Sequence, residues 1–162
     1  MLNRVMHFTY RVKVSIFPNK FLEEIKLSEL DMQKIFETHK NPRIRKAFEV
    51  AKKFHAGQVD KSGTEYIYHP TTVAFNCGND DSAIITALLH DTVEDTELTF
   101  DELQKLIPLT DEELNALKLL THDNATPYFD YVKKIKANEL AKRLTNSPRL
   151  GGFRYHQPML QN

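Results

Sequence analysis

The sequence predicts an all-α protein, in which one helical domain follows a short N-terminal strand. From residue 28 onward apolar residues recur at helical spacing, and helix-start signals recur between them. The 162 residues, with 41% hydrophobic content and five glycines, suit one domain with a sizeable core. We expect residues 1–27 to form an N-terminal extension, residues 28–143 the domain, and residues 144–162 a divergent tail.

Composition argues against several classes of partner. Basic and acidic residues number 22 each, so the net charge favours neither nucleic acid nor an anionic membrane. Every apolar run is shorter than the roughly 20 residues that span a bilayer, and the N-terminus does not resemble a secretory signal. The lone cysteine, Cys77, suits a reducing compartment. We therefore expect a cytoplasmic protein.

Residues 5–17 alternate apolar and polar side chains, which is the period of a half-buried strand. The rest of the chain is predicted to be helical, so we expect no partner strand for it. Three roles stay open for this segment: an appended arm, a contact in a dimer, or an extension without fixed order.

The helices follow from their start and stop signals. A helix over about 28–38 precedes one that begins at Asn41-Pro42, ends near His55 and buries Ile44, Phe48, Ala51 and Phe54. Two glycines mark residues 56–68 as a loop. Further helices are expected from His69-Pro70 to about Phe75, from Asp80 or Asp81 to His90, from Thr99 to before Pro108, from Thr110 to about Thr121, and from Pro127 through Ile135.

The most informative stretch is the uncharged run 83–89, which ends in His90-Asp91. The run places the doublet at the edge of a buried helix, where an imidazole and a carboxylate cost several kcal/mol unless they are compensated. A bound metal ion would compensate them, because it gives both groups a common partner. The alternative is a helix end with a surface histidine and a capping aspartate.

Glu94 and Asp95 follow His90 by about one helical turn. A carboxylate there can orient a metal-bound water or accept its proton. The alternative is an acidic helix C-terminus in solvent, which is disfavoured because acids at that end oppose the helix dipole.

Two further histidines are candidate ligands. His55 ends the helix before the loop, where a neutral imidazole could complete a metal set with His90 and Asp91. On its own it is more often a C-terminal histidine that the helix dipole favours. His69, before Pro70, has less weight, because a histidine beside a helix start more often caps the helix or supports a ligand.

Two pairs of residues are candidates for substrate binding. Lys61 and Ser62 lie in the loop, where a cation, a hydroxyl and backbone N–H groups can meet a phosphate, although an ordinary polar loop has the same composition. Tyr128 and Tyr131 share a helix face and could stack on a base or ribose. Helix packing is the slightly favoured alternative for the tyrosines.

Three ordered motifs, at residues 54–58, 61–70 and 87–96, resemble the HD-domain superfamily of metal-dependent phosphohydrolases. Within it, about 100 residues most resemble the RelA/SpoT-type guanosine 3′,5′-bis(diphosphate) hydrolases, in particular the small stand-alone alarmone hydrolases. The resemblance implies an HD-domain helical bundle. It also implies removal of the 3′-pyrophosphate of (p)ppGpp, the nucleotide of the stringent response, to give GDP or GTP and pyrophosphate.

The resemblance further implies a division of roles. A divalent metal, usually manganese (Mn²⁺), would be held by His55, His90 and Asp91. Other residues would activate the attacking water and meet the nucleotide: Glu94 and Asp95 for the water, Lys61 and Ser62 for the nucleotide.

The chain departs from this family where the family has a fourth metal ligand, an aspartate in a late helix. No acidic residue follows Glu139. Manganese prefers oxygen-rich sites, so loss of a carboxylate predicts weaker metal binding and impaired hydrolase activity. Two alternatives stay open: a hydrolase of another phosphorylated nucleotide such as NADPH, and a degenerate HD protein that binds nucleotide without turnover.

Overall fold

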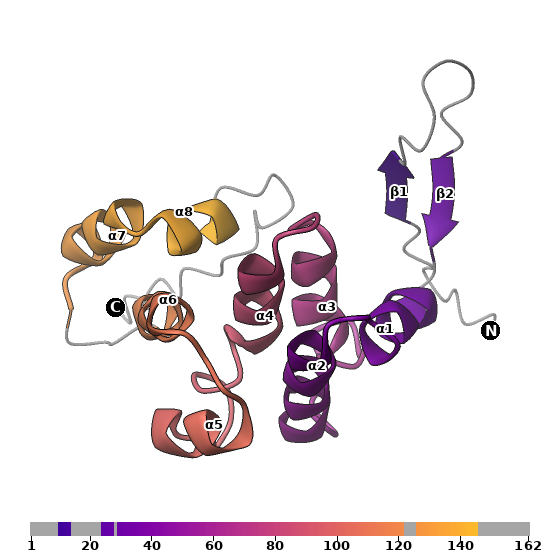
Figure 1. The fold of residues 1–162 in the computed structure, drawn as a ribbon, viewed down its shortest axis with the longest axis horizontal. Helices are drawn as coiled ribbons and strands as arrows, with labels where there is room; N and C mark the ends of the chain where they lie inside the picture. The colour runs from indigo at the N-terminus through magenta and orange to yellow at the C-terminus, as the bar shows by residue number, and fades with distance from the viewer. Residues whose placement is uncertain (1–9, 14–23, 28, 122–125, 146–162) are drawn as a thin grey trace, which may run out of the picture.

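The computed structural model describes residues 10–13, 24–27, 29–121 and 126–145. The expected all-α fold is confirmed in this part of the chain, with a small strand pair beside it (Figure 1). The elements are β1 (Tyr10–Lys13), β2 (Glu24–Leu27), α1 (Glu29–Glu37), α2 (Pro42–Phe54), α3 (Tyr68–Phe75), α4 (Asp81–Leu89), α5 (Phe100–Leu106), α6 (Asp111–Leu120), α7 (Tyr128–Ala137) and α8 (Glu139–Thr145).

β1 and β2 pair as antiparallel strands, with Tyr10 opposite Leu27 and Lys13 opposite Glu24. The strand expected within residues 5–17 is confirmed over 10–13, and the remaining residues of that range, 5–9 and 14–17, lie outside the described residues. The expectation that it has no partner is wrong. β2 has four residues, too few for a period-two pattern to stand out against the helix that follows.

Most helices begin at the caps that the sequence predicts. The Asn41 side chain accepts a hydrogen bond from the Arg43 backbone N–H at 2.8 Å, and Asp80 accepts one from Ala83 at 3.0 Å. Both capping boxes are present, at Thr99 with α5 and at Thr110 with α6. These side chains satisfy N–H groups that the first helical turn leaves without partners.

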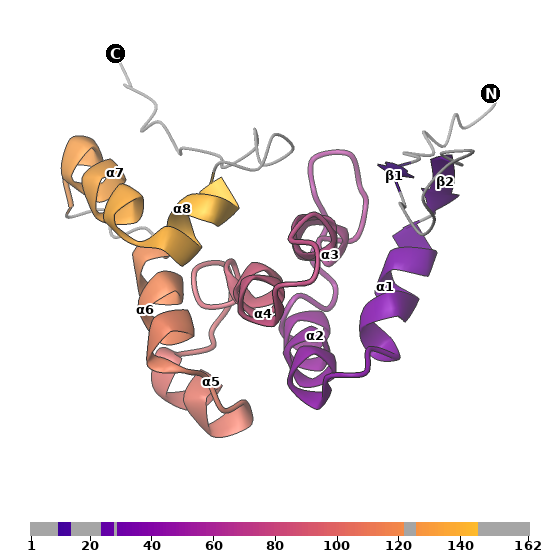
Figure 2. The ribbon, with the colours of Figure 1, turned by 45° about the horizontal axis from the view of Figure 1, so that its top comes forward.

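α4 is the central helix, and it contacts α2, α3, α6 and α8 (Figures 1 and 2). Each of its residues from Ala83 to Leu89 is buried. On α2, Ile44, Phe48 and Ala51 are at most 1% exposed, as their helical spacing predicts. Burial of a side chain such as Ile44 or Phe48 stabilises the folded state by about 1.5–3 kcal/mol. Buried contacts of this kind hold α4 against its neighbouring helices. None of the described helices is long and apolar enough to cross a membrane.

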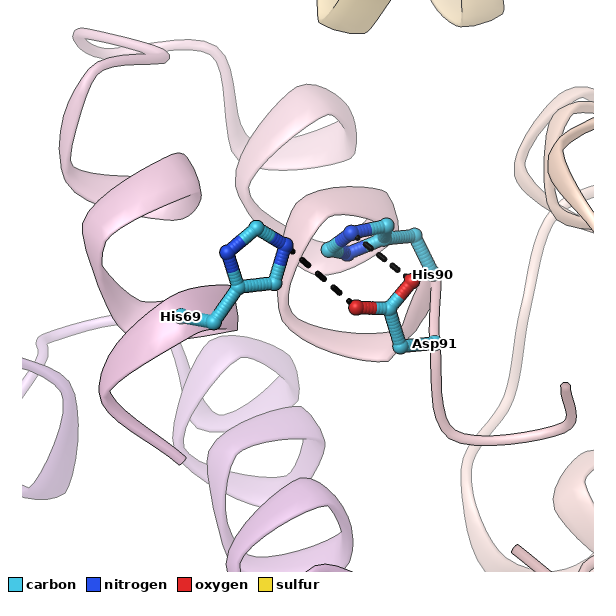
Figure 3. A group of neighbouring side chains, drawn as sticks. All are labelled: His69, His90 and Asp91. Atoms are coloured by element: carbon cyan, nitrogen blue, oxygen red, sulfur yellow. Dashed lines mark ion pairs between the residues drawn. The ribbon is translucent and has the colours of Figure 1, made fainter. Parts of the chain in front are cut away.

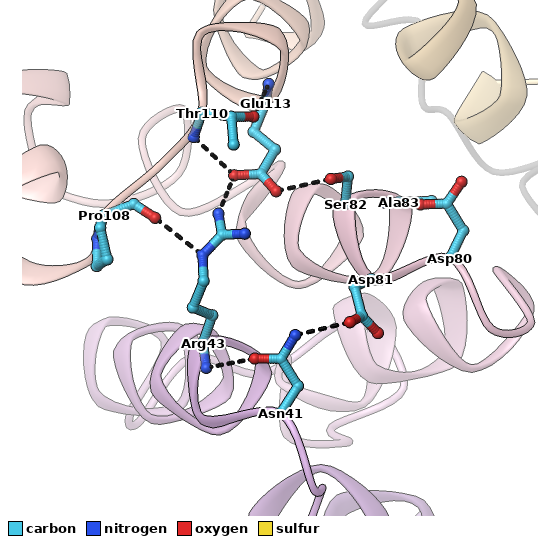
Figure 4. A network of polar contacts seen from close by, with 9 residues as sticks. All are labelled: Asn41, Arg43, Asp80, Asp81, Ser82, Ala83, Pro108, Thr110 and Glu113. Carbon is cyan, nitrogen blue, oxygen red and sulfur yellow. Dashed lines mark hydrogen bonds and ion pairs between the residues drawn. The ribbon is translucent and has the colours of Figure 1, made fainter.

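The N-terminal ends of α2, α4 and α6 are joined by a polar network (Figure 4). The Arg43 guanidinium forms an ion pair with the fully buried Glu113. Glu113 also accepts a hydrogen bond from the Ser82 hydroxyl at 2.9 Å, which ties α6 to α4. The Asn41 amide donates to Asp81 at 2.7 Å, which ties α2 to α4. The network fixes one end of α4 and so helps to orient its opposite end.

α8 is absent from the helices that the sequence predicts. It begins after Asn138, whose side-chain oxygen accepts a hydrogen bond from the Ala141 N–H at 2.9 Å. This asparagine cap is a signal that sequence reasoning could have used. α8 buries Leu140, Ala141 and Leu144. The rest of the expected C-terminal tail, residues 146–162, lies outside the described residues.

Candidate metal centre

The candidate site begins where α4 ends. His90 follows Leu89 with helical φ and ψ of −58° and −38°. Asp91 then lies in a turn that the Asp95 N–H closes by donating to the Asp91 carbonyl at 2.8 Å. The sequence predicts a helix that reaches His90, and α4 ends one residue earlier, at Leu89. A hydrogen bond from the Thr92 N–H to the Leu89 carbonyl tightens the chain there.

His69, His90 and Asp91 form one cluster (Figure 3). His69 Nε2 lies 3.4 Å from Asp91 Oδ2, and His90 Nε2 lies 3.0 Å from Asp91 Oδ1. One possible ligand atom from each residue lies within 4.8 Å of the others. The cluster forms because α3 packs beside α4, which places the first turn of α3 next to the end of α4.

The expected set of His55, His90 and Asp91 differs from this cluster, in which His69 takes the place of His55. Tyr66 stands between His55 and Asp91: its ring centroid lies 4.9 Å from that of His55, and its hydroxyl donates to Asp91 at 2.8 Å. His55 is 2% exposed, and its Nδ1 contacts Gln58. Its Nε2 is buried and has no hydrogen-bond partner among the residues that the structure describes. The sequence could not show that His69 lies beside Asp91, because adjacency to a helix start does not tell which neighbouring helix a side chain meets.

The cluster stabilises opposite charges on neighbouring groups. Burial disfavours a charged Asp91, but His90, His69 and the Tyr66 hydroxyl outweigh it and hold the pKa of this carboxyl well below its usual range. Burial likewise disfavours a charged His90, yet Asp91, the Ala87 carbonyl and Glu94 raise its pKa above the ordinary value. The Asp91 carboxylate is therefore stabilised by positive charge beside it, which a protonated His90 supplies and a divalent metal ion could also supply.

The donor chemistry fits a divalent metal. His90 Nδ1 lies 2.8 Å from the Ala87 carbonyl oxygen, so in the neutral ring Nδ1 carries the proton and the Nε2 lone pair faces the cluster. Two imidazoles and one carboxylate are a donor set that divalent transition metals accept. In the described residues the set contains a single carboxylate, so it is poorer in oxygen than the family pattern implies.

Glu94 and Asp95, the expected catalytic pair, are exposed in the turn after the cluster. Asp95 accepts a hydrogen bond from the Tyr66 hydroxyl at 2.9 Å, while the charge of Glu94 acts on His90. Both residues line a cleft of about 610 Å³, together with Lys53, Phe54, Gln58, Thr96 and Glu97. The turn therefore carries two carboxylates beside the cluster and open to solvent.

The expected loop is a tight hairpin. The Asp60 N–H donates to the Thr64 carbonyl at 2.8 Å, and Gly63 adopts a φ of +85° that favours glycine. The Asp60 carboxylate accepts from the Ser62 N–H at 2.7 Å and from the Ser62 hydroxyl at 2.6 Å. The Ser62 hydroxyl hydrogen is therefore used within the loop, while Lys61 is exposed. Asp60 is a residue that we missed, although Asp-x-Ser is typical of such turns.

Of the tyrosine pair expected on α7, the structure describes the side chain of Tyr131. Tyr131 is 7% exposed and belongs to the hydrophobic core, and its hydroxyl donates to the Leu120 carbonyl at 3.2 Å. This favours the packing alternative for Tyr131. The side chain of Tyr128 lies outside the described part of the structure.

Comparison with known proteins gives one family and several relatives. Residues 47–114 match the HD domain family, whose members bind divalent metals. The chain is 40% identical over 89 residues to a guanosine-3′,5′-bis(diphosphate) 3′-pyrophosphohydrolase of Aquifex aeolicus. The aligned region covers 52% of this chain and 13% of that protein. It is 39% identical over 75 residues to the bifunctional (p)ppGpp synthase/hydrolase SpoT of Escherichia coli. Here the aligned region covers 44% of this chain and 11% of that protein.

A third relative has a different name. A GTP pyrophosphokinase of Streptomyces coelicolor is 43% identical over 72 residues, which cover 43% of this chain and 8% of the relative. The matches thus span only a small part of each of these long proteins. The family match covers α3, α4 and α5 and so includes the whole cluster of His69, His90 and Asp91. Residues 47–114 of this chain therefore match the HD domain family, and part of the chain is similar in sequence to a protein named guanosine-3′,5′-bis(diphosphate) 3′-pyrophosphohydrolase.

Proposed function

We propose that this chain is a metal-dependent phosphohydrolase that removes the 3′-pyrophosphate of (p)ppGpp. The observation that carries the proposal is the cluster of His69, His90 and Asp91 inside an HD domain. The names of the Aquifex and Escherichia relatives supply the substrate class. In the reaction water adds across the bond between the 3′ oxygen and the pyrophosphate: its hydroxyl goes to phosphorus and its proton to the 3′ oxygen.

In this proposal the metal ligands are His69, His90 and Asp91, and the ion is Mn²⁺. A bound divalent ion lowers the pKa of water and polarises a phosphoryl oxygen. Glu94, with Asp95, orients the attacking water and accepts its proton, because both carboxylates lie in the turn directly after the ligands. These roles are consistent with the exposure of the pair to solvent.

The remaining roles concern the substrate and the chain as a whole. Lys61 is exposed at the tip of the hairpin and would neutralise phosphate charge, while Ser62 would shape the hairpin through Asp60. We propose residues 28–143 as the catalytic domain. The lone Cys77 supports a cytoplasmic location.

The test is a product assay with purified protein, ppGpp and Mn²⁺. We expect GDP and pyrophosphate in equal amounts, and no release from Asp91→Asn. Parallel reactions with pppGpp and NADPH test the breadth of substrate. Release of orthophosphate from NADPH without cleavage of ppGpp would contradict the proposal and favour another phosphorylated nucleotide.

A second candidate function is nucleotide binding without turnover. The observation that favours it is the absence of any acidic residue after Glu139, where the family pattern supplies a fourth ligand. Equilibrium binding of ppGpp, measured by calorimetry with Mn²⁺ present, separates the two candidates. Binding without product over many hours would favour this second function, whereas turnover would exclude it.

A further inference from the structure

Tyr66 lies directly behind the candidate metal ligands and has no role in the proposed function. It precedes α3, and its ring lies 4.9 Å from the His55 ring and 5.8 Å from the His69 ring, between centroids. Its hydroxyl contacts Asp91 Oδ2 at 2.8 Å and Asp95 Oδ2 at 2.9 Å. The single hydrogen of this hydroxyl group is shared between the two carboxylate oxygens, so it links a candidate ligand to a member of the acidic pair.

Gln58 reaches the same turn by a second route. Its Nε2 donates to the backbone carbonyl of Asp95 at 2.8 Å, and its Oε1 lies 2.7 Å from His55 Nδ1. When His55 Nδ1 donates to Oε1, the amide N–H₂ of Gln58 must point toward Asp95. The buried His55 ring thus orients Gln58 and also packs against Tyr66.

The contacts of Asp91 and Asp95 restrict the orientation of both residues. His90 meets Oδ1 of Asp91, whereas His69 and Tyr66 both meet Oδ2, so the plane of the carboxylate is defined from two sides. Asp95 is exposed, and an exposed side chain ordinarily samples several rotamers. The Tyr66 hydroxyl and the Gln58 amide restrict its side chain and backbone respectively.

We propose that Tyr66, supported by His55 and Gln58, is a positioning residue that holds Asp91 and Asp95 in a fixed mutual orientation. What the positioned groups do rests on the proposed function, whereas the positioning itself concerns the side chains alone. In this arrangement His55 supports the candidate metal ligands through its contacts with Tyr66 and Gln58. Groups that orient ligands typically change metal affinity about 10–100-fold when they are removed.

The central experiment compares the parent protein with Tyr66→Phe, which removes the hydroxyl and keeps the ring. We expect Mn²⁺ affinity in calorimetry to fall about 10–100-fold, and the spectrum of bound Mn²⁺ in electron paramagnetic resonance to change. The matched control is Thr38→Val, which removes a hydroxyl that donates to the Lys34 carbonyl at 2.9 Å at the end of α1. We expect this control to bind Mn²⁺ like the parent.

A double-mutant cycle tests the link between Tyr66 and Asp95. If the hydroxyl acts partly through Asp95, the effect of Tyr66→Phe on Mn²⁺ affinity should be smaller in an Asp95→Asn background. Crystal structures of the parent and of Tyr66→Phe provide a readout without metal, in which both aspartates should change rotamer. Unchanged aspartates together with an affinity within two-fold of the parent would overturn the proposal. Should Tyr66→Phe fail to fold, Gln58→Leu carries the same measurements.

The outcomes for the proposed function are separate. Suppose that Mn²⁺ affinity depends on Tyr66 but the parent protein does not hydrolyse ppGpp. This result would contradict the proposed function and support the positioning role. Hydrolysis by the parent, with Tyr66→Phe binding Mn²⁺ as tightly and keeping its aspartates in place, would overturn the positioning role alone. If the parent binds no Mn²⁺, the two crystal structures decide the positioning role by themselves.

Discussion

At the scale of single residues, the structure separates two histidines that the motifs bring close in sequence. His69 faces Asp91 at 3.4 Å, whereas His55 is held by Gln58 and Tyr66. Their chemistry is the same, so only their surroundings distinguish the ligand that we propose, His69, from the supporting group that we propose, His55. This difference leads us to expect losses of Mn²⁺ affinity of different size when the two histidines are substituted.

We expect His69→Ala to weaken Mn²⁺ binding more than His55→Gln does. Loss of a ligand removes a bond to the ion, whereas loss of a supporting group costs about 10–100-fold in affinity. The control is His39→Ala, because His39 accepts a hydrogen bond from the Asn41 N–H at the start of α2, in another part of the fold. Calorimetric titration with Mn²⁺ measures all three. Equal losses for both site histidines would instead restore His55 as a ligand.

At the scale of elements, charged side chains at the helix ends join one helix to another. The Asp80 side chain caps α4 and also pairs with Arg143 of α8 at 2.6 Å. The hydrogen bond from Ala83 lowers the pKa of the Asp80 carboxyl, burial opposes it, and Arg143 lowers it further. One side chain therefore links the start of the central helix to the last described helix.

This link predicts a loss of stability in acid. A carboxyl whose pKa is lower in the folded state stabilises the protein above its unfolded pKa of about 3.9, and the contribution disappears as the pH falls through the folded value. We expect Asp80→Ala to lower the free energy of unfolding at pH 7 by about 0.5–2 kcal/mol, the usual cost of losing a cap. The difference from the parent should shrink below about pH 4. Urea unfolding at several pH values measures it, and a difference independent of pH would contradict the expectation.

The buried Glu113 leads to a larger expected effect. It pairs with Arg43 and also accepts from Ser82 and from the Thr110 N–H, so its removal leaves several partners without an acceptor. We expect Glu113→Ala to destabilise the fold by about 3 kcal/mol, as when one partner of a buried pair is removed. Glu112→Ala is the matched control, because Glu112 is exposed one residue away and should change stability by less than about 0.5 kcal/mol. Similar values in urea unfolding would show that the network contributes little.

At the scale of the whole molecule, the candidate centre joins α3 to the turn after α4. A ligand that binds only the folded state stabilises that state by mass action, by about 2.7 kcal/mol at 100 times its dissociation constant. For a chain of this size that corresponds to a rise in Tm of roughly 5–10 °C. We expect Mn²⁺ to produce this rise in the parent and not in Asp91→Asn. An equal rise in both proteins would place the ion elsewhere.

The order of helices and most of their boundaries follow from local chemistry. Asn41, Asp80, Thr99 and Thr110 cap helices where the sequence predicts, because a cap bonds to a backbone N–H only two or three residues away. The uncharged run before His90 likewise predicts the buried α4. Weaker local signals were missed: β2 is too short to show its period, and α8 begins after an asparagine cap that carries no stronger pattern.

The membership of the site depends on distances between segments far apart in sequence. His90 and Asp91 are evident from the sequence because they are adjacent to a buried run, whereas the choice between His55 and His69 depends on which helix packs against α4 and on where Tyr66 lies. Packing of this kind arises from side chains of several helices at once, and no local pattern encodes it. The sequence was therefore enough to single out His90 and Asp91, two residues of the cluster, while the place of His69 in it required the packing of α3 against α4.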